Sequence, residues 1–482
     1  MNVREITNLL EDKSTKNIAL IEKAYSFAEK THAEQKRYSG EPYFTHIFAV
    51  AKTLAEMKMD ATTIAAGFLH DTIEDAHVSE KDIEKEFGKE IAFLIEGVSK
   101  LGKLKYRGME RHVESLRKFF VAMSTDIRVL IIKLADRLHN IQTLQYVPKE
   151  KQKRIAVETL EIHARLADRL GMGRLRNGLE DAFQYAYPLE YEKTKELLKE
   201  KRISGEKDVE KIHRELQKEL AKEGMNKIRT ESRLKHVYSL YKKLEKRNMD
   251  ISKIYDIVAL RVIVKNVEDC YKVLGIIHRI WRPLPGRIKD YIALPKPNGY
   301  RSLHTTIFTG DGGIVEIQIR TEEMNQEAEY GIASHLFYKE KGASDAHNIG
   351  WVKQLSEWQR EVSHSGEFLK HLKADFFRYR VFVFTPKGDV IDLPEESSPI
   401  DFAYTIHSDI GDHIAGAIVN GKLVPLDTKL KNGDIVQIDT KKNATPKSKW
   451  LDYTKTTVAK RHIKNYLDAN NPFKKFLPKK FR

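Results

Sequence analysis

Cysteine is almost absent from this chain of 482 residues, which contains only Cys270. A single cysteine excludes an intrachain disulfide and a zinc site built from several thiolates, and it favours a reducing compartment. No apolar run approaches the roughly 20 residues that a membrane-spanning helix needs. The first residues, MNVREITNLLED, contain acidic side chains where a signal peptide has an apolar stretch. We therefore expect a cytoplasmic protein with no membrane partner.

A phosphate-binding loop of the form G-x-x-x-x-G-K-[ST] is also missing. The stretch GMGRLRNG at 171–178 follows a predicted helix and not a strand, so it indicates a helix break and not a dinucleotide-binding loop. A nucleotide triphosphate would therefore have to be held by cationic side chains and by a carboxylate-bound metal ion.

Positive charge is concentrated at one end of the chain. The sequence has 84 Lys and Arg against 69 Asp and Glu, and residues 441–482 hold 13 of these basic residues but only two acidic ones. Aromatic side chains are interleaved with the cations, as on many RNA-binding surfaces. The pattern fits a solvated helix with a frayed end equally well, and the sequence leaves both interpretations open.

Hydrophobic periodicity divides the chain into a helical front part, a mixed α/β part and a small β-rich part. Apolar residues at three- and four-residue spacing predict helices over 17–32, 43–57, 61–75 and 125–144. In the middle part, β-rich runs at 254–265 and 313–321 flank a helix predicted near 268–280. In the last part, YRVFVFTPKGDVIDLP (379–394) predicts a hairpin.

Four residues of the helical part form a candidate metal site. Asp136 lies in VLIIKLADRLHNI, a helix that is apolar on nearly every side, so its carboxylate is predicted to be buried and to need a cation. His46 and the adjacent pair His70-Asp71 could hold a metal ion with it. Imidazoles and carboxylates together suit manganese, zinc or iron.

Further polar residues accompany this candidate site. Glu74 and Asp75 each lie four residues after one member of the His70-Asp71 pair, so one helix is predicted to present ligands and acid–base groups on neighbouring faces. Asn140 lies one turn beyond the buried aspartate. Any one of these histidines alone would be an ordinary core or surface histidine, but the full order His…His-Asp…Asp is the pattern of HD metal-dependent phosphohydrolases.

Cations and aromatic rings gather in the α/β part. ESRLKHVYSLYKKL (231–244) places Arg233, Lys235 and His236 at a predicted helix start, where free backbone amides also favour phosphate. PGRIKDYIALPKPNGYRSLHTT (285–306) has further cations beside tyrosines. Phosphates can take the charge while a base stacks on a ring, so these segments indicate a nucleotide site.

Two acidic residues lie in otherwise favourable strand sequences. Asp256 opens the run IVALRVIV, and Glu316 lies on the polar face of VEIQIRT. A carboxylate pair on one sheet face can hold magnesium and remove a proton from an attacking hydroxyl. VEIQIRT alone would be an ordinary half-exposed strand, but the basic segments around it favour the catalytic interpretation.

In this order, the motifs closely resemble those of the long, bifunctional alarmone synthetase/hydrolases of bacteria, the RelA/SpoT homologue family. RYSGEPYFTH, GFLHDTIED and KLADRLHN resemble the hydrolase motifs, and GRIKDYIALPKPNGYRSLHTT and VEIQIRT resemble the synthetase motifs. The resemblance implies a multidomain fold with an all-α HD hydrolase domain, an α/β nucleotidyltransferase-like synthetase domain and a small β-grasp TGS domain. The expected segments are hydrolase 1–190, helical connector 191–225, synthetase 226–345, connector 346–378, TGS 379–441 and basic tail 442–482.

The resemblance also implies roles for single residues. In the hydrolase these are manganese ligands His46, His70, Asp71 and Asp136, water-activating acids Glu74 and Asp75, and nucleotide contacts Arg37 and Asn140. In the synthetase they are the magnesium ligand Asp256, the general base Glu316 and the ATP contacts Arg233, Lys235 and Lys243. Tyr300 matches the ring that stacks on guanine, Lys296, Asn298 and His304 match the acceptor side, and Lys289 belongs to a basic tetrad (287–290) of the nucleotide site. His407 matches a TGS residue that senses tRNA.

The implied chemistry is a pair of opposed reactions. A synthetase would transfer pyrophosphate from ATP to the 3′-hydroxyl of GDP or GTP, and a hydrolase would return (p)ppGpp to GDP or GTP. The expected cofactors are Mn²⁺ in the hydrolase and Mg²⁺ in the synthetase, and the expected partners include tRNA or the ribosome through the TGS domain and the tail.

Two other interpretations stay open. Ser232, Leu234 and the HLF stretch at 335–337 depart from the family pattern, which would fit a hydrolase with a degenerate synthetase half. The basic tail and the TGS module would fit a non-catalytic regulator that binds RNA. A synthesis assay and a salt-dependent RNA affinity separate these from a bifunctional enzyme.

Overall fold

The computed structural model describes residues 1–76, 78–102, 126–225, 228–296, 298–310, 313–334, 380–431 and 433–470. The HLF stretch and the predicted connector at 346–378 lie outside these ranges. The chain forms two compact units, Met1–Glu357 and Trp358–Arg482, and each is described by itself. Among the described residues, no helix has both the length and the apolar content to cross a bilayer.

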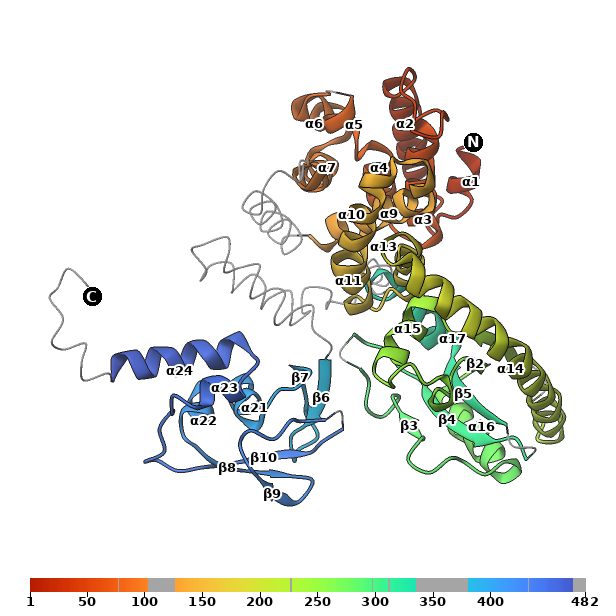
Figure 1. The fold of residues 1–482 in the computed structure, drawn as a ribbon. Coiled ribbons are helices and arrows are strands. Elements are labelled where there is room, and N and C mark those ends of the chain that lie inside the picture. Colours follow the sequence, from red (N-terminus) through yellow and green to blue (C-terminus); the bar gives the residue numbers. More distant parts are fainter. Residues whose placement is uncertain are drawn as a thin grey trace, which may run out of the picture. The chain divides into compact units, whose positions relative to one another are not determined.

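The front of the first unit is all helical, as predicted (Figure 1). Side-chain caps begin three of its main helices, from Ser14, Asp60 and Asp126. The helices up to the end of α9 are α1 (Arg4–Thr7), α2 (Thr15–Thr31), α3 (Phe44–Glu56), α4 (Ala61–Leu69), α5 (Thr72–Asp75), α6 (Glu80–Phe87), α7 (Lys89–Gly102) and α9 (Ile127–Gln142).

One predicted helix is wrong in extent. The range 61–75 is not one helix but two, because α4 ends at Leu69 and α5 begins at Thr72. Side chains take over the carbonyl groups at the break: the Thr72 hydroxyl donates to Leu69 O at 2.6 Å, and His70 Nδ1 donates to Gly67 O at 2.8 Å. The pair His70-Asp71 therefore lies at a bend and not along a continuous helical face.

Helix α9 is the centre of the front core. Its side chains from Val129 to Ile132, together with Leu134 and Ala135, are fully buried, and it packs against α3, α4, α7 and α12. This arrangement brings one face of α3 and the end of α4 beside the middle of α9.

A second group of helices follows and leads into a long helix. These are η1 (Leu144–Tyr146), α10 (Lys149–Glu158), η2 (Thr159–His163), α11 (Ala164–Arg169), α12 (Gly173–Glu180), α13 (Phe183–Ala186) and α14 (Pro188–Lys222). The helix break predicted within 171–178 is found between α11 and α12. Helix α14 buries Val209, Ile212, Leu216 and Leu220 at helical spacing against the following sheet, so the predicted helical connector is also part of that domain's core.

The α/β part is a five-stranded mixed sheet with the order β1-β2-β5-β4-β3, in which only β2 and β5 run parallel. Its elements are β1 (Arg229–Leu234), α15 (Val237–Glu245), η3 (Ile251–Lys253), β2 (Val258–Val264), α16 (Val267–Ile280), β3 (Lys289–Asp290), β4 (Leu303–Phe308), β5 (Ile314–Thr321) and α17 (Glu322–Tyr330). Arg233 was expected at a helix start, but it lies in β1 opposite Ala259, because residues 229–234 pair with β2.

The second unit contains the predicted hairpin. Strands β6 (Arg380–Phe384) and β7 (Val390–Pro394) are antiparallel, and Gly388, with φ +91°, donates to Thr385 O within the turn. A separate sheet has the order β10-β8-β9. The remaining elements are α21 (Pro399–Ile406), α22 (Ser408–Asp412), β8 (Ile414–Val419), β9 (Lys422–Val424), β10 (Val436–Thr440), α23 (Trp450–Tyr453) and α24 (Thr457–Ala469).

Part of the predicted basic tail belongs to the folded module. Trp450 and Ile463 are buried against α21, and the buried Asp401 carboxylate accepts hydrogen bonds from Lys455 N at 2.9 Å and Thr456 N at 2.7 Å. A buried carboxylate needs such donors. The prediction of a tail from residue 442 is therefore corrected: α23 and α24 pack on the β-rich module, and residues 471–482 lie outside the described residues.

Candidate metal centre and nucleotide site

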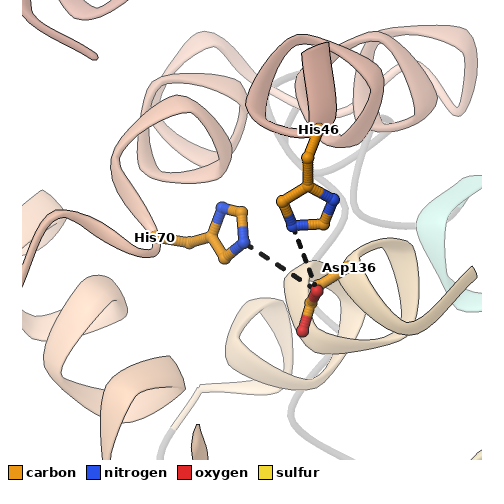
Figure 2. A group of neighbouring side chains, drawn as sticks. All are labelled: His46, His70 and Asp136. Carbon is orange, nitrogen blue, oxygen red and sulfur yellow. Dashed lines mark ion pairs between the residues drawn. The ribbon is translucent and has the colours of Figure 1, made fainter. Parts of the chain in front are cut away.

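Three side chains from separate helical segments converge in the front part of the chain. His46 lies in α3, His70 directly follows α4, and Asp136 lies in α9. Their ligand atoms all lie within 4.8 Å of one another, and all three residues are buried. Figure 2 shows both imidazoles beside the carboxylate: His46 Nε2 lies 3.3 Å and His70 Nε2 4.0 Å from Asp136 Oδ1. Two imidazole nitrogens and a carboxylate oxygen at this spacing fit a divalent metal ion.

Hydrogen bonds on the far side of each ring orient the two imidazoles. Nδ1 of His70 donates to Gly67 O, which leaves its buried Nε2 facing the carboxylates of Asp71 and Asp136. Burial would lower the pKa of His70, but the charge and hydrogen bond of Asp71 raise it to about 9, so a metal ion bound here would displace a proton from Nε2. Nδ1 of His46 lies 2.9 Å from Nδ1 of His139. Burial lowers the pKa of His139 to about 3, so this ring is neutral and its Nδ1 can accept a hydrogen bond from Nδ1 of His46. Both Nε2 atoms are thereby set up to bind a metal ion.

Asp71, the fourth predicted ligand, lies beside the two imidazoles but is not one of the three residues whose ligand atoms all lie within 4.8 Å of one another. Its Oδ2 lies 3.1 Å from His70 Nε2 and 3.5 Å from His46 Nε2. The Tyr43 hydroxyl lies 2.8 Å from Oδ2 of Asp71 and also 2.8 Å from Oδ2 of Asp75. Tyr43 therefore links a predicted metal ligand to a predicted water-activating acid.

Asp136 also has partners of its own. Nζ of Lys133 donates to its Oδ2 at 2.7 Å, and Asn140 Nδ2 donates to its Oδ1 at 2.5 Å. Arg37 in turn donates to Asn140 Oδ1 and to Thr143 Oγ1, both at 3.0 Å. The structure thus brings the two predicted nucleotide contacts, Arg37 and Asn140, to the edge of the metal cluster.

Glu74 has a raised pKa, whereas the pKa values of Asp71 and Asp136 are held well below their usual range. Burial raises the pKa of Glu74 to about 7, against the opposing charge of Lys133 and with a further rise from Asp71 and Asp75. A carboxyl group with a pKa near neutrality can both accept and return a proton.

In the α/β part, two lysines converge on Asp256 ahead of strand β2. Nζ of Lys235 lies 2.5 Å from Asp256 Oδ2, and Lys243 on α15 contacts the same oxygen. Burial alone would raise the pKa of Asp256, but the two ammonium groups hold it well below its usual range. Burial lowers the pKa of Lys235 to about 8. The predicted magnesium ligand and two of the predicted ATP contacts thus form one cluster.

Glu316 on β5 is held by neighbours on the same sheet. His304 Nδ1 lies 3.2 Å from Glu316 Oε1, and Gln318 Nε2 donates to that oxygen at 2.8 Å. Arg233 donates to Gln318 Oε1 at 3.1 Å. Burial would raise the pKa of Glu316, but the hydrogen bond and charge of His304 lower it to about 2, so Glu316 is ionised.

Predicted acceptor-side residues form an aromatic cluster, called the ring-lined wall below, made of Tyr291, Lys296, Tyr300 and His304. Nζ of Lys296 lies over the rings of Tyr291 and Tyr300, 4.7 and 4.9 Å from their centroids, and Tyr300 Oη lies 2.9 Å from His304 Nε2. Burial lowers the pKa of Lys296 to about 8. Lys289 on β3 is paired with His304 on β4, which places it at the same edge of the sheet.

Two predicted site residues have other surroundings. Asn298 Nδ2 donates to Asp168 O at 3.0 Å, so its side chain is held by the front helical part. His407 lies in the second unit, where it is exposed and caps α22 by accepting from Asp409 N at 3.2 Å.

Comparison with known proteins agrees with this division of the chain. An HD domain matches residues 24–173, the region found in RelA/SpoT proteins matches 232–343, and a TGS domain matches 381–440. The chain belongs to the RelA/SpoT family. The predicted fold class, with hydrolase-type, synthetase-type and TGS domains, is confirmed.

Three curated relatives extend the match across the RelA/SpoT chain. The chain is 47% identical over 450 residues to the guanosine-3′,5′-bis(diphosphate) 3′-pyrophosphohydrolase of Aquifex aeolicus. The match covers 93% of this chain and 64% of that protein. It is 45% identical over 459 residues to the GTP pyrophosphokinase of Myxococcus xanthus (94% and 60%) and 44% identical over 467 residues to the bifunctional (p)ppGpp synthase/hydrolase SpoT of Escherichia coli (96% and 66%). The chain thus spans 60–66% of the length of these relatives.

Sequence reasoning missed three residues of the front site, namely Tyr43, Lys133 and His139. Each lies near a predicted ligand in sequence: Tyr43 three residues before His46, and the other two three residues on either side of Asp136. Helical spacing would have placed Lys133 and His139 within reach of Asp136. No local signal shows that Tyr43 reaches Asp75.

Proposed function

We propose that this RelA/SpoT chain is a bifunctional alarmone enzyme, which synthesises and hydrolyses (p)ppGpp. The observation that supports it is the presence of two complete polar clusters in one chain, the His46–His70–Asp136 group and the Lys235–Asp256–Lys243 group, beside relatives named for each activity and for both. We also propose a cytoplasmic location, because the proposed substrates ATP and GTP are found there. We also propose the segment boundaries predicted from the sequence, with α23 and α24 added to the TGS domain.

In the proposed hydrolysis, water attacks the phosphorus of the 3′-pyrophosphate, the bond from phosphorus to O3′ breaks, and pyrophosphate and GDP or GTP leave. The residues that would hold the metal ion, which we propose to be Mn²⁺, are His46, His70, Asp71 and Asp136. When bound, such an ion acidifies a water molecule and polarises phosphate oxygens. Glu74, with its pKa near neutrality, would accept the proton of water and return one to O3′.

Other side chains of the front site would position the substrate. Arg37 lies at the rim of the cluster and can pair with phosphate oxygens. Asn140 already contacts Asp136 and could donate to the nucleotide with its remaining hydrogen. Tyr43 would help to position Asp75 beside Asp71, because its one hydroxyl hydrogen can be donated to either carboxylate.

In the proposed synthesis, the 3′-hydroxyl of GDP or GTP attacks the β-phosphorus of ATP and AMP leaves. Glu316 would take the proton of that hydroxyl, with His304 and Gln318 holding its Oε1 in place. A Mg²⁺ ion held by Asp256 would neutralise phosphate charge. Lys235 and Lys243, which share Asp256 in the structure, can pair with the phosphates. Arg233 donates to Gln318 on β5, the strand that also carries Glu316.

The acceptor nucleotide is proposed to bind along the ring-lined wall. Tyr300 offers a face for the guanine base, and Lys296, Lys289 and His304 surround the same edge of the sheet. Asn298 lies in the loop between these residues.

Two incubations test the proposal. The full chain is mixed with ATP, GDP and Mg²⁺, and separately with guanosine tetraphosphate and Mn²⁺, and nucleotides are separated by chromatography. We expect AMP and tetraphosphate in the first and GDP and pyrophosphate in the second, with loss of hydrolysis after chelation. Hydrolysis alone would identify a degenerate synthetase half, and neither reaction would overturn the proposal.

We also propose tRNA or ribosomal RNA as a partner of the TGS domain. His407 is exposed there, and Arg461 and Lys464 are exposed on α24. Their contribution is tested by measuring RNA affinity over a range of salt, because each phosphate contact adds to the salt dependence. Replacement of Lys464 by Glu should weaken binding, and an unchanged affinity and salt slope would contradict the assignment.

A further inference from the structure

A turn of the front helical domain packs so closely against the backbone of the α/β domain that its glycines could not carry a Cβ atom. The turn is residues 170–173, between α11 and α12. A Cβ atom on Gly171 would lie 2.8 Å from Asn298 O and 3.3 Å from the Cα of Gly331, and one on Gly173 would collide with Ala328 O. These neighbours are backbone atoms, which cannot move aside alone, so the fit requires glycine on both sides.

Hydrogen bonds cross at the same place. Ile332 N, just after α17, donates to Leu170 O at 2.9 Å. Asn298 Nδ2 donates to Asp168 O at 3.0 Å, and the carboxylate of Asp168 is in turn bound by Arg176 Nη1 at 2.7 Å. Main-chain hydrogen bonds together with close backbone packing define one relative position of the two segments.

The loop held in this way carries the ring-lined wall. Within it, Lys296 N donates to Tyr300 O at 3.1 Å, and Gly299 N donates to Lys296 O at 2.8 Å. Oδ1 of Asn298 accepts from Tyr300 N at 3.3 Å, so one amide side chain is bound both to the wall and to the front domain. A displacement of the turn would therefore move Tyr300 and Lys296 directly.

The same part of the front domain also holds the other side of the nucleotide site. His236, the residue before α15, lies 2.9 Å from Asp181 Oδ1 by its Nε2, and Ser239 Oγ donates to Glu180 Oε2 at 3.0 Å. The rings of Phe183 and Tyr241 pack with centroids 4.9 Å apart. Helix α15 carries Lys243, one of the two lysines on Asp256.

We propose that residues 168–183 of the front domain are a positioning element of the α/β domain's nucleotide site. In particular, the 171–173 turn fixes the position of the loop that carries Lys296 and Tyr300, the residues proposed to bind the guanosine nucleotide. This inference rests on the proposed function for the identity of the bound nucleotide. The residues in 168–183 touch no reacting group; they act through the 296–300 loop and through α15. Synthesis should therefore depend on a segment that lies outside the synthetase region in sequence.

The test compares Gly173→Ala with Gly275→Ala in the full chain. Gly275 lies in α16 with open space around it, so its replacement is a matched control. Gly173→Ala should raise KM for GDP about tenfold in synthesis, because a displacement of the order of 1 Å has effects of this size or larger. Hydrolysis should change less than twofold, and Gly275→Ala should leave both reactions unchanged.

A second readout is independent of catalysis. Hydrogen exchange should quicken at the amides of Gly299 and Tyr300 in Gly173→Ala, while the amides of α4 stay protected. Unchanged exchange in the 296–300 loop, or an equal loss of both reactions in a folded variant, would overturn the inference. If the unaltered chain makes no alarmone, the proposed function fails, whereas exchange still decides the positioning role.

A milder variant covers the case in which Gly173→Ala does not fold. Glu180→Gln keeps a hydrogen-bond acceptor for Ser239 but removes the charge beside His236. Glu180 is buried, but its ion-pair partner His236 is partly exposed, so the loss of this charge should have a modest effect. We expect KM for ATP to rise about threefold with hydrolysis unchanged. An unchanged KM for ATP would contradict the role of the 180–183 contacts.

Discussion

Nζ of Lys133 lies 2.7 Å from Oδ2 of Asp136, while the other oxygen of the same carboxylate faces His46. The two residues are three apart on α9, and both side chains are largely buried. One oxygen of Asp136 thus has a permanent cation from the protein, and the other is directed at the metal cluster. The charge of this buried carboxylate is divided between a lysine and the proposed ion.

Replacement of Lys133 by Met should destabilise the metal-free chain more than the metal-loaded one. Without metal, the loss of one partner leaves a buried carboxylate short of a cation, at a cost of about 3 kcal/mol. Bound Mn²⁺ should at least halve this cost, because the ion balances the charge from the other side. Urea unfolding with EDTA and with Mn²⁺ measures the difference.

Lys195→Met is the matched control for this prediction. Lys195 pairs at the surface with Glu192 at 3.8 Å, and both side chains are more than half exposed. Its replacement should change stability by less than about 0.5 kcal/mol with or without metal. Equal losses for Lys133→Met in the two conditions would contradict a shared charge.

Replacement of Tyr43 by Phe should reduce hydrolysis by 10- to 100-fold, the usual range for a residue that orients metal ligands. The ring would still stack on His32, whose centroid lies 5.2 Å away, so the fold should be kept. Only the link between Asp71 and Asp75 would be lost. Steady-state hydrolysis of the tetraphosphate measures the effect. Tyr25→Phe, which removes a hydroxyl bound to Met1 O, should behave like the unaltered chain.

Replacement of Asp256 by Asn should reduce the rate of synthesis by at least about 100-fold, because this carboxylate is the proposed ligand of Mg²⁺. Hydrolysis should stay within twofold, because Asp256 belongs to the α/β domain. Lys243→Gln should mainly raise KM for ATP, whereas Lys242→Gln, at a surface pair with Glu245, should not. A parallel loss of hydrolysis in Asp256→Asn would show that the two clusters are not separate sites.

The pair of His236 with the acids of the front domain predicts a pH dependence. Burial would lower the pKa of His236, but the hydrogen bonds and charges of Asp181 and Glu180 raise it to about 9, above the ordinary value of 6.5. The charged ring therefore stabilises the fold fully below pH 6.5, and this contribution is lost as the pH rises through 9.

Thermal unfolding of His236→Gln measures that contribution. At pH 6 the variant should melt about 2 °C below the unaltered chain, and the two should converge by pH 10. A constant difference across this range would mean that the contact does not depend on the charge of His236.

Local pattern in the sequence determined much of this protein. Apolar spacing predicted α2, α3 and α9 closely, alternation predicted β5, and the burial of Asp136 followed from the aliphatic residues around it. Residue types and motif order also predicted which residues belong to each candidate site, and the structure brings most of the predicted hydrolase residues together.

Only the tertiary structure decided which groups meet. The bend at His70-Asp71 depends on side-chain bonds to Leu69 and Gly67 that compete with the helix. Arg233 became a strand residue because β2 was there to pair with it. The contact of Gly173 with Ala328 joins segments more than 150 residues apart. Periodicity specifies which face of an element is buried, whereas the partner of that face depends on how distant segments pack together.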